Sequence, residues 1–134
     1  MNPIVRRMLV AVPFAAAALV GCGEIKKAQE CSALIDTINK GQASLTGGSG
    51  TDAKAVEEQA KKMEEFQKLV SDVKVTDPEL TKMVDEYKAM IGDMAKLTSG
   101  AAKGELKDFD KKIDEIVKKE DALVDKINGY CSRQ

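Results

Sequence analysis

Apolar residues recur at intervals of three and four along four separate stretches of this chain, and this spacing limits its fold more than any other feature. Such intervals gather residues on one side of an α-helix, whereas a half-buried strand requires strict alternation. Strand-like alternation appears nowhere at useful length, so the sequence predicts an all-α protein. The apolar positions are Ile25, Ala28, Cys31 or Ser32, Leu34, Ile35 and Ile38, then Val56, Ala60, Met63, Phe66, Leu69, Val70 and Val73, then Leu80, Met83, Val84, Tyr87, Ile91, Met94, Ala95 and Leu97, and finally Leu106, Phe109, Ile113, Ile116, Val117, Leu123, Val124 and Ile127.

A glycine-rich segment separates the first two stretches. The first helix is expected to stop near Gly41, because glycine commonly follows the last turn of a helix. Residues 41–52 carry four glycines and no periodicity, which predicts a flexible loop. Thr51 or Asp52 can then cap the second helix by accepting a hydrogen bond from a free backbone amide.

The third helix has the clearest start in the chain. Asp77 is expected to cap it, Pro78 to occupy its first position, and Thr76 with Glu79 to form a capping box. A second loop is expected over residues 98–104.

The fourth helix is then expected to end at Asn128-Gly129. Four amphipathic helices with short or glycine-rich connections predict an antiparallel up-down-up-down four-helix bundle.

Charged residues follow the outer faces of these helices as acids placed four residues before lysines. This orientation stabilises a helix by a few tenths of a kcal/mol per pair. Adjacent acids such as Glu57-Glu58 and Glu64-Glu65 resemble carboxylate pairs for catalysis or metal binding, but lysines neighbour them at helical spacing, so we interpret them as a solvated face. The acid and lysine pairs are Glu57-Lys61, Glu58-Lys62, Glu64-Lys68, Asp108-Lys112, Asp114-Lys118 and Glu115-Lys119.

Three features of the third and fourth helices leave alternatives open. Methionines at 83, 90 and 94 are interpreted as core rather than as an adaptable binding stripe. Gly92 lies inside a helix and can permit close approach of a neighbour. Glu120 falls on the apolar seam; we expect it to reach outward or meet a lysine, and the alternative is a functional polar group in the core.

The N-terminus carries a short apolar run behind Arg6 and Arg7, which ends in Leu19-Val20-Gly21-Cys22. These four residues resemble the lipobox of bacterial lipoproteins. The resemblance implies that residues 1–21 are a cleaved signal peptide, that Cys22 carries a covalent lipid, and that residues 22–134 form one helical domain on a membrane. Gly23 after the cysteine, rather than Asp, resembles lipoproteins sorted to the outer membrane. The apolar run is too short to span a bilayer, which needs about 20 residues.

The chain has three cysteines. Lipidation of Cys22 would leave Cys31 and Cys131, which are expected to form a disulfide in an oxidising periplasm; the alternative is two buried free thiols. The up-down-up-down topology places both at the bundle end that faces the membrane, together with the turn at 74–77. Both glycine-rich loops then lie at the far end, where a partner-facing surface is expected.

Composition excludes several chemistries. The chain contains no His, which removes Ser-His-Asp and Cys-His catalysis and histidine metal sites. Without Arg6 and Arg7 the remaining chain has 19 basic and 22 acidic residues, a net charge of −3 that does not favour nucleic acid. We therefore expect no metal and no cofactor other than the lipid.

Two functions follow from these features. The first is a non-enzymatic lipoprotein of the cell envelope that faces the periplasm and binds or positions another envelope protein. The alternative is a carrier of a lipid or other small apolar ligand in the bundle core. An enzyme using Glu120 or a surface acid pair ranks third.

Overall fold

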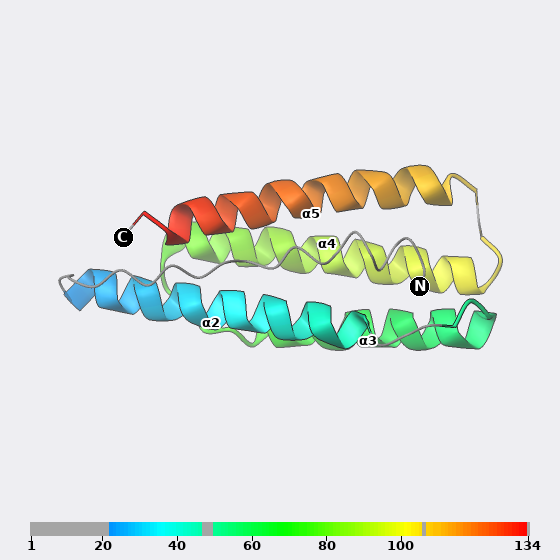
Figure 1. Ribbon diagram of the computed structural model, residues 1–134, viewed down its shortest axis with the longest axis horizontal. Helices are drawn as coiled ribbons and strands as arrows, with labels where there is room; N and C mark the ends of the chain where they lie inside the picture. The colour runs from blue at the N-terminus through cyan, green and yellow to red at the C-terminus, as the bar shows by residue number, and fades with distance from the viewer. Residues whose placement is uncertain (1–21, 47–49, 106, 134) are drawn as a thin grey trace.

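The computed structural model describes residues 22–46, 50–105 and 107–133, which form a four-helix bundle (Figure 1). Each helix runs antiparallel to the one before it, so the predicted up-down-up-down topology is confirmed. No strand occurs within the described ranges, in agreement with the predicted all-α class. The expected signal peptide lies outside these residues. The helices are α2 (Cys22–Leu45), α3 (Ala53–Ser71), α4 (Pro78–Ala102) and α5 (Phe109–Cys131).

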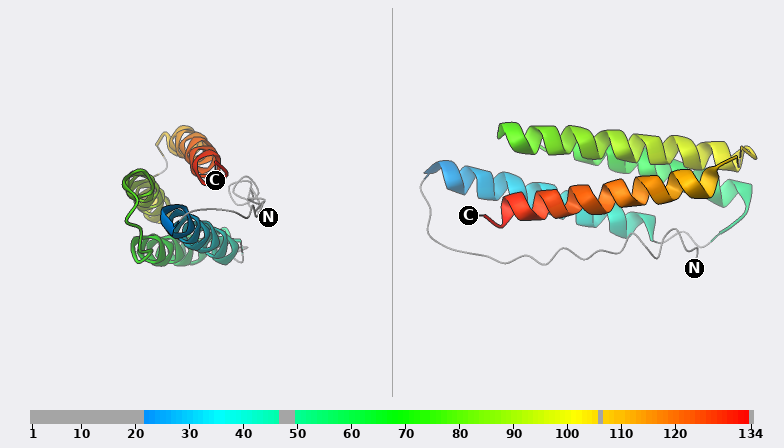
Figure 2. Two further views of the ribbon diagram at one scale, coloured as in Figure 1. Left: turned by 90° about the vertical axis from the view of Figure 1, so that its left-hand side faces the viewer. Right: turned by 90° about the horizontal axis from the view of Figure 1, so that it is seen from above.

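The four helices pack unevenly. α3 and α4 make the most extensive contact, α4 and α5 come next, and α2 touches α5 much less. The end-on view in Figure 2 shows α4 flanked by α3 and α5. The N-terminal end of α2 extends past the end of α5 in Figures 1 and 2. None of the helices described is long and apolar enough to cross a membrane.

The core is formed by the inward faces of all four helices. Met83, Met90 and Met94 are buried there, which confirms the core interpretation of these methionines. The rings of Phe66 and Tyr87 meet edge to face, with centroids 6.0 Å apart, a contact worth about 0.5–1.5 kcal/mol beyond its buried area. The largest fully enclosed side chains are Tyr87, Leu34, Met63, Leu80, Ile127 and Val70.

Two residues assigned to apolar helix faces are exposed instead. Ile25 keeps 49% of its surface accessible and Leu69 keeps 51%. Ile25 lies in the first turn of α2. Leu69 precedes the fully buried Val70, and a turn of about 100° per residue carries it away from the core.

Helix α2 was expected to stop near Gly41. It continues instead to Leu45. Gly41 is buried and faces the Phe66 ring of α3. A Cβ atom at this position would overlap that ring. Glycine is therefore needed here because the helices approach closely, and not because the chain makes a left-handed turn. The local sequence does not distinguish these two roles of glycine.

Replacing Gly41 by Ala is expected to destabilise the protein, although Ala favours a helix by about 1 kcal/mol. The added methyl group would overlap the ring of Phe66, which is only 2% exposed. Overpacking of this kind costs about 1–3 kcal/mol. Thermal unfolding of Gly41→Ala checks this. Gly129→Ala is the matched control, because its new methyl group would meet no neighbour closer than 4.0 Å; stabilisation of both variants would contradict the expectation.

The expected loop at 98–104 is also mostly helical, because α4 continues through Ala102. Thr98 is buried, with its hydroxyl 3.6 Å from the Met63 sulfur, so this turn belongs to the core. The chain leaves the helix beyond Ala102, and Gly104 takes the positive φ of 85° that glycine tolerates best.

Helix α5 likewise passes its expected end at Asn128-Gly129 and finishes at Cys131. Gly92, by contrast, permits the close approach of a neighbouring helix, as predicted. The Gln67 amide of α3 donates to the Lys88 carbonyl at 2.9 Å, and a Cβ on Gly92 would lie 2.5 Å from the same nitrogen.

The predicted cap of α3 and one of its predicted acid–lysine pairs are present. Asp52 is its N-cap and accepts a hydrogen bond from the Ala55 amide at 2.9 Å. Glu57 and Lys61 form an exposed ion pair at 3.5 Å. The acid pairs at 57-58 and 64-65 are all exposed, which confirms the solvated face.

Candidate functional site

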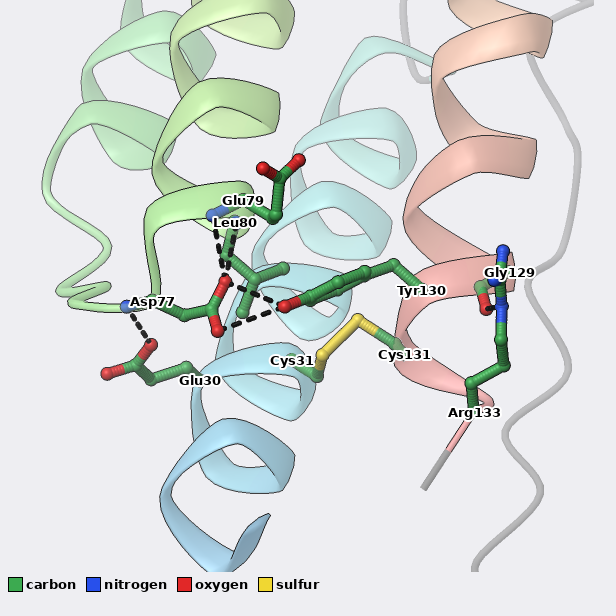
Figure 3. Close-up of a disulfide and its surroundings, with 9 residues drawn as sticks. All are labelled: Glu30, Cys31, Asp77, Glu79, Leu80, Gly129, Tyr130, Cys131 and Arg133. Carbon is green, nitrogen blue, oxygen red and sulfur yellow. Dashed lines mark hydrogen bonds between the residues drawn. A yellow bond between two sulfur atoms is a disulfide. The ribbon is translucent and has the colours of Figure 1, made fainter. Parts of the chain in front are cut away.

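A polar junction joins α2, α4 and α5 at the bundle end that carries Cys31 and Cys131 (Figure 3). It consists of Glu30, Thr76, Asp77 and Tyr130. The Glu30 carboxylate, which is 7% exposed, accepts a hydrogen bond from the Thr76 hydroxyl at 2.6 Å and one from the Asp77 amide at 3.0 Å. The turn before α4 is thus fixed to α2.

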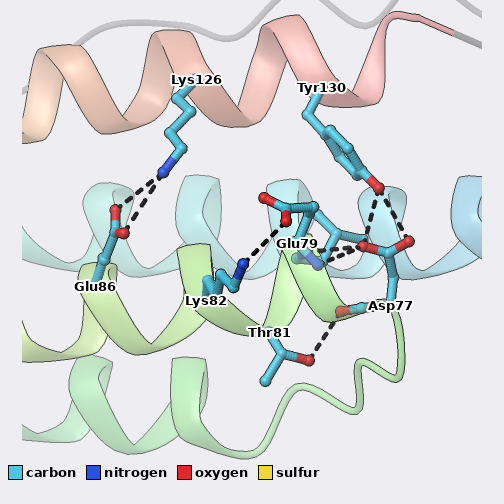
Figure 4. Close-up of polar contacts among 8 residues, drawn as sticks. Asp77, Glu79, Thr81, Lys82, Glu86, Lys126 and Tyr130 are labelled. Carbon is cyan, nitrogen blue, oxygen red and sulfur yellow. Dashed lines mark hydrogen bonds and ion pairs between the residues drawn. The ribbon is translucent and has the colours of Figure 1, made fainter.

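Asp77 is the centre of this junction. Its carboxylate caps α4 by accepting from the Glu79 and Leu80 amides at 3.0 and 2.9 Å. The Tyr130 hydroxyl of α5 donates to the same carboxylate, with both oxygens at 3.0 Å (Figure 4). The predicted cap at Asp77 and the helix start at Pro78 are therefore confirmed.

The capping box expected from Thr76 and Glu79 does not form. Such a box uses an acid three residues into the helix to bind the backbone amide of the cap. Here Glu30, which is 47 residues away in sequence, binds the amide of Asp77, and Thr76 also donates to Glu30. A tertiary contact has replaced the local one.

A disulfide joins Cys31 to Cys131 beside the junction, with their Cα atoms 5.7 Å apart (Figure 3). Each cysteine directly follows a junction residue, Glu30 in α2 and Tyr130 in α5. The Lys27 ammonium lies 3.8 Å from the centre of the Tyr130 ring, a cation–π contact that adds to the link between these helices.

Hydrogen bonds set the ionisation of the junction. Burial acts to raise the pKa of Glu30, but the donors from Thr76 and Asp77 outweigh it and hold the pKa below its usual value of 4.5. The Leu80 amide contributes most to lowering the pKa of Asp77 below 3.8. Burial, followed by the bond to Asp77, raises the pKa of Tyr130. The junction therefore holds two carboxylates in the ionised form at neutral pH.

Glu120 departs from the expected outward orientation. It is 5% exposed and lies in the core, where its Oε1 accepts from the Gln42 amide at 3.2 Å and from the Tyr87 hydroxyl at 3.1 Å. The prediction was wrong because α2 and α4 supply donors that a sequence pattern on α5 does not reveal. Burial raises the pKa of Glu120 above 4.5, and that of Tyr87 above 10.0.

The raised pKa of Glu120 gives folding stability a definite pH dependence. Between 4.5 and the raised pKa, the folded protein holds a proton that the unfolded chain has released, so stability falls as pH rises through this window. We expect Glu120→Gln, which does not titrate, to gain stability relative to wild type as the pH is raised from about 5 to about 8. Urea unfolding of both proteins checks this; a constant difference would contradict it.

A surface groove runs between α4 and α5. It consists of two adjoining hollows of about 430 and about 580 Å³, both bordered by Asp93 and Lys119. Glu120 lines neither hollow. The first is lined by Glu86, Ala89, Met90, Asp93, Lys119, Ala122, Leu123 and Lys126. The second is lined by Asp93, Lys96, Leu97, Gly100, Glu105, Lys107, Lys112, Glu115, Ile116 and Lys119.

Along the first hollow the groove has rims of opposite charge, whereas Lys96 of α4 and Glu115 of α5 interrupt this pattern in the second hollow. Glu86 and Asp93 are seven residues apart on α4, and Lys112, Lys119 and Lys126 repeat at the same interval on α5. A seven-residue interval places residues along one line of a helix. One ion pair crosses the groove, between Lys126 and Glu86 at 3.4 Å (Figure 4).

Fold and site together define a disulfide-linked all-α four-helix bundle with a polar junction at one end and a charged-rim groove along one flank. Comparisons with protein families, curated proteins and solved structures find no match for this chain. Its function is therefore inferred from its own residues. Within the described ranges, no three His, Cys, Asp or Glu side chains gather closely enough to hold a metal ion.

Sequence reasoning missed three residues that the structure brings into these sites. Glu30 and Tyr130 form the junction, and Gln42 binds Glu120. For Glu30 and Tyr130 the one available signal in the sequence was that each directly precedes a paired cysteine. Cys22 begins α2, and its side chain lies outside the part of the chain that the structure describes.

Proposed function

We propose that this protein is a non-enzymatic lipoprotein of the bacterial cell envelope, anchored by a lipid on Cys22, whose bundle binds another envelope protein. The lipobox-like Leu19-Val20-Gly21-Cys22 supports the anchor and, with Gly23, an outer-membrane location facing the periplasm. The disulfide fits such an oxidising compartment. The observation that carries the binding role is the groove between α4 and α5.

The dimensions of the groove suit one helix of a partner protein. Glu86 and Gly100, at the two ends of the α4 side, are 14 positions apart, which corresponds to about 21 Å of helix. Its floor includes apolar side chains from α4 and α5, with Ala89 and Ala122 leaving room for close approach. Amphipathic helices bind such grooves through their apolar face.

The charges on the two rims of the groove indicate which charges the partner helix carries. The lysine rim of α5 favours acidic residues along one edge of the partner helix, and Glu86 with Asp93 favours basic residues along the other. Opposed rims of this kind also fix the direction in which a helix lies. The proposed partner is therefore an amphipathic helix whose two polar edges carry opposite charge.

The carrier alternative receives less support from the described residues. The methionines that motivated it are buried in packed contacts. The hollow between α2 and α5, bordered by Ile35, Ile38, Val124, Ile127 and Asn128, measures about 10 Å³, about one water-sized probe. A lipid would require the helices to separate.

Site-specific photocrosslinking in native membranes tests the binding role. A photoreactive residue at Ala122, in the groove, is expected to capture one defined protein, whereas the same residue at Ala33, an exposed alanine of α2, is not. Lys119→Glu should reduce the yield from position 122, because it reverses a rim charge. Equal capture from both positions, or a yield unaffected by Lys119→Glu, would contradict the proposal. Lipid extracted from the purified bundle would favour the carrier.

A further inference from the structure

The first turn of α2 is positioned to contact the membrane surface itself, in addition to the lipid proposed on Cys22. Helix α2 begins at Cys22, so rigid helix rather than a flexible linker leads from this residue into the bundle. Lys27 over Tyr130, Glu30 in the polar junction and the disulfide at Cys31 tie this part of α2 to the rest of the bundle. The angle between this turn and the bundle is thereby fixed.

Distances along the helix place Ile25 close to any lipid on Cys22. A rise of 1.5 Å per residue puts Ile25 about 4.5 Å beyond Cys22 and on nearly the same face, whereas Cys31 lies about 13 Å away. The headgroup layer of a leaflet is about 5–7 Å thick. A lipid on Cys22 therefore brings Ile25 into this layer and leaves the disulfide outside it.

Two side chains of this turn match that environment. Ile25 is one of the exposed large apolar side chains, with 49% of its surface accessible. Lys26 beside it is exposed and long enough to place its ammonium among lipid phosphates. One and two heptads beyond Cys22 on the same face stand Gln29 and Asp36, both exposed, so the apolar face ends after one turn.

We propose that the first turn of α2 inserts into the headgroup layer of the membrane, with Ile25 toward the acyl chains and Lys26 on the phosphates, so that the bundle stands out from the surface. This inference rests on the lipid anchor of the proposed function. The polar face at Gln29 and Asp36 opposes a bundle that lies flat on the bilayer.

Tryptophan fluorescence tests the insertion directly, because the chain contains no Trp. Ile25→Trp and Leu69→Trp are matched, since the two positions are 49% and 51% exposed. The contact of Gly41 with Phe66 aligns α2 with α3 and separates the two positions by about 20 Å along the bundle. Each lipidated variant is reconstituted in vesicles of phosphatidylethanolamine and phosphatidylglycerol that carry a nitroxide quencher near the glycerol.

The expected result is a blue shift and loss of emission for Ile25→Trp, with neither change for Leu69→Trp. Intact mass shows whether Cys22 carries its lipid. Lipidated protein with unquenched emission at position 25 would overturn the insertion and leave the anchor standing. Quenching at position 69 would overturn the upright orientation. Absence of lipid mass would overturn the anchor and this inference with it.

A second measurement uses the unsubstituted protein, in case a tryptophan variant is not exported. Lys26 and Lys54 are both exposed, the first at the lipidated end of α2 and the second in the first turn of α3 at the far end. In the same vesicles, a water-soluble acylating reagent should modify Lys54 and leave Lys26 protected. Equal modification of the two lysines would overturn the insertion.

Discussion

Replacing Cys31 and Cys131 by serine is expected to lower the free energy of unfolding by about 4–5 kcal/mol, because their bond closes a loop across a sequence separation of 100 residues. In a domain of this size the loss corresponds to a fall in Tm of roughly 15–20 °C. The hydrogen bonds of the polar junction remain available in the variant. They contribute only about 1 kcal/mol each and do not restrain the unfolded chain.

Thermal unfolding followed by circular dichroism provides the measurement. Wild-type protein treated with a reductant should unfold at the temperature of the double serine variant, and the reductant should leave that variant unchanged. A variant that melts within a few degrees of oxidised wild type would show that the bond adds little restraint. Helical content at low temperature serves as the control for an intact fold.

Glu120→Ala is expected to have an effect of similar size, about 2–5 kcal/mol. The substitution removes the acceptor of both the Tyr87 hydroxyl and the Gln42 amide, and each buried group left without a partner costs about 1–3 kcal/mol. It also leaves a cavity where α2, α4 and α5 meet, which adds to the cost.

Two milder variants separate these causes. In Glu120→Gln the amide oxygen can still accept from Tyr87 and Gln42, so its stability should stay within about 1 kcal/mol of wild type near neutral pH. Tyr87→Phe removes one bond and should fall between the two. Urea unfolding ranks the three variants; an alanine variant as stable as wild type would show that the network contributes nothing to folding.

The starts of α3 and α4 could be predicted from the sequence because their causes are local. Asp52 and Asp77 each accept from an amide within three residues, so the cap and its effect lie in one short segment. The period of the apolar residues likewise reports the buried face of each helix. All-α class and bundle topology follow from these two signals together.

Helix ends could not be predicted in the same way. Gly41 and Gly129 resemble helix stops, yet both lie inside helices. Gly41 is required by Phe66, 25 positions later in the chain, and the last turn of α5 is held by Cys131. Glycine both ends helices and admits neighbours, and only the packed structure shows which role applies.

The polar sites were beyond sequence reasoning for a related reason. Glu30 binds the turn before α4 across 46 and 47 residues, and Gln42 reaches Glu120 across 78. No local pattern encodes such pairings. Glu120 was recognised as unusual because it interrupts an apolar seam, but its hydrogen-bond donors come from other helices.

The disulfide also determines how the protein would respond to force. A pull applied between residue 22 and residue 133 travels along α2 to Cys31, crosses to Cys131 and leaves through Ser132 and Arg133. The tension bypasses the residues between the two cysteines. Only the first nine residues of α2, about 13 Å of helix, and the two residues after Cys131 could stretch, so the groove and the buried network would keep their shape under such a load.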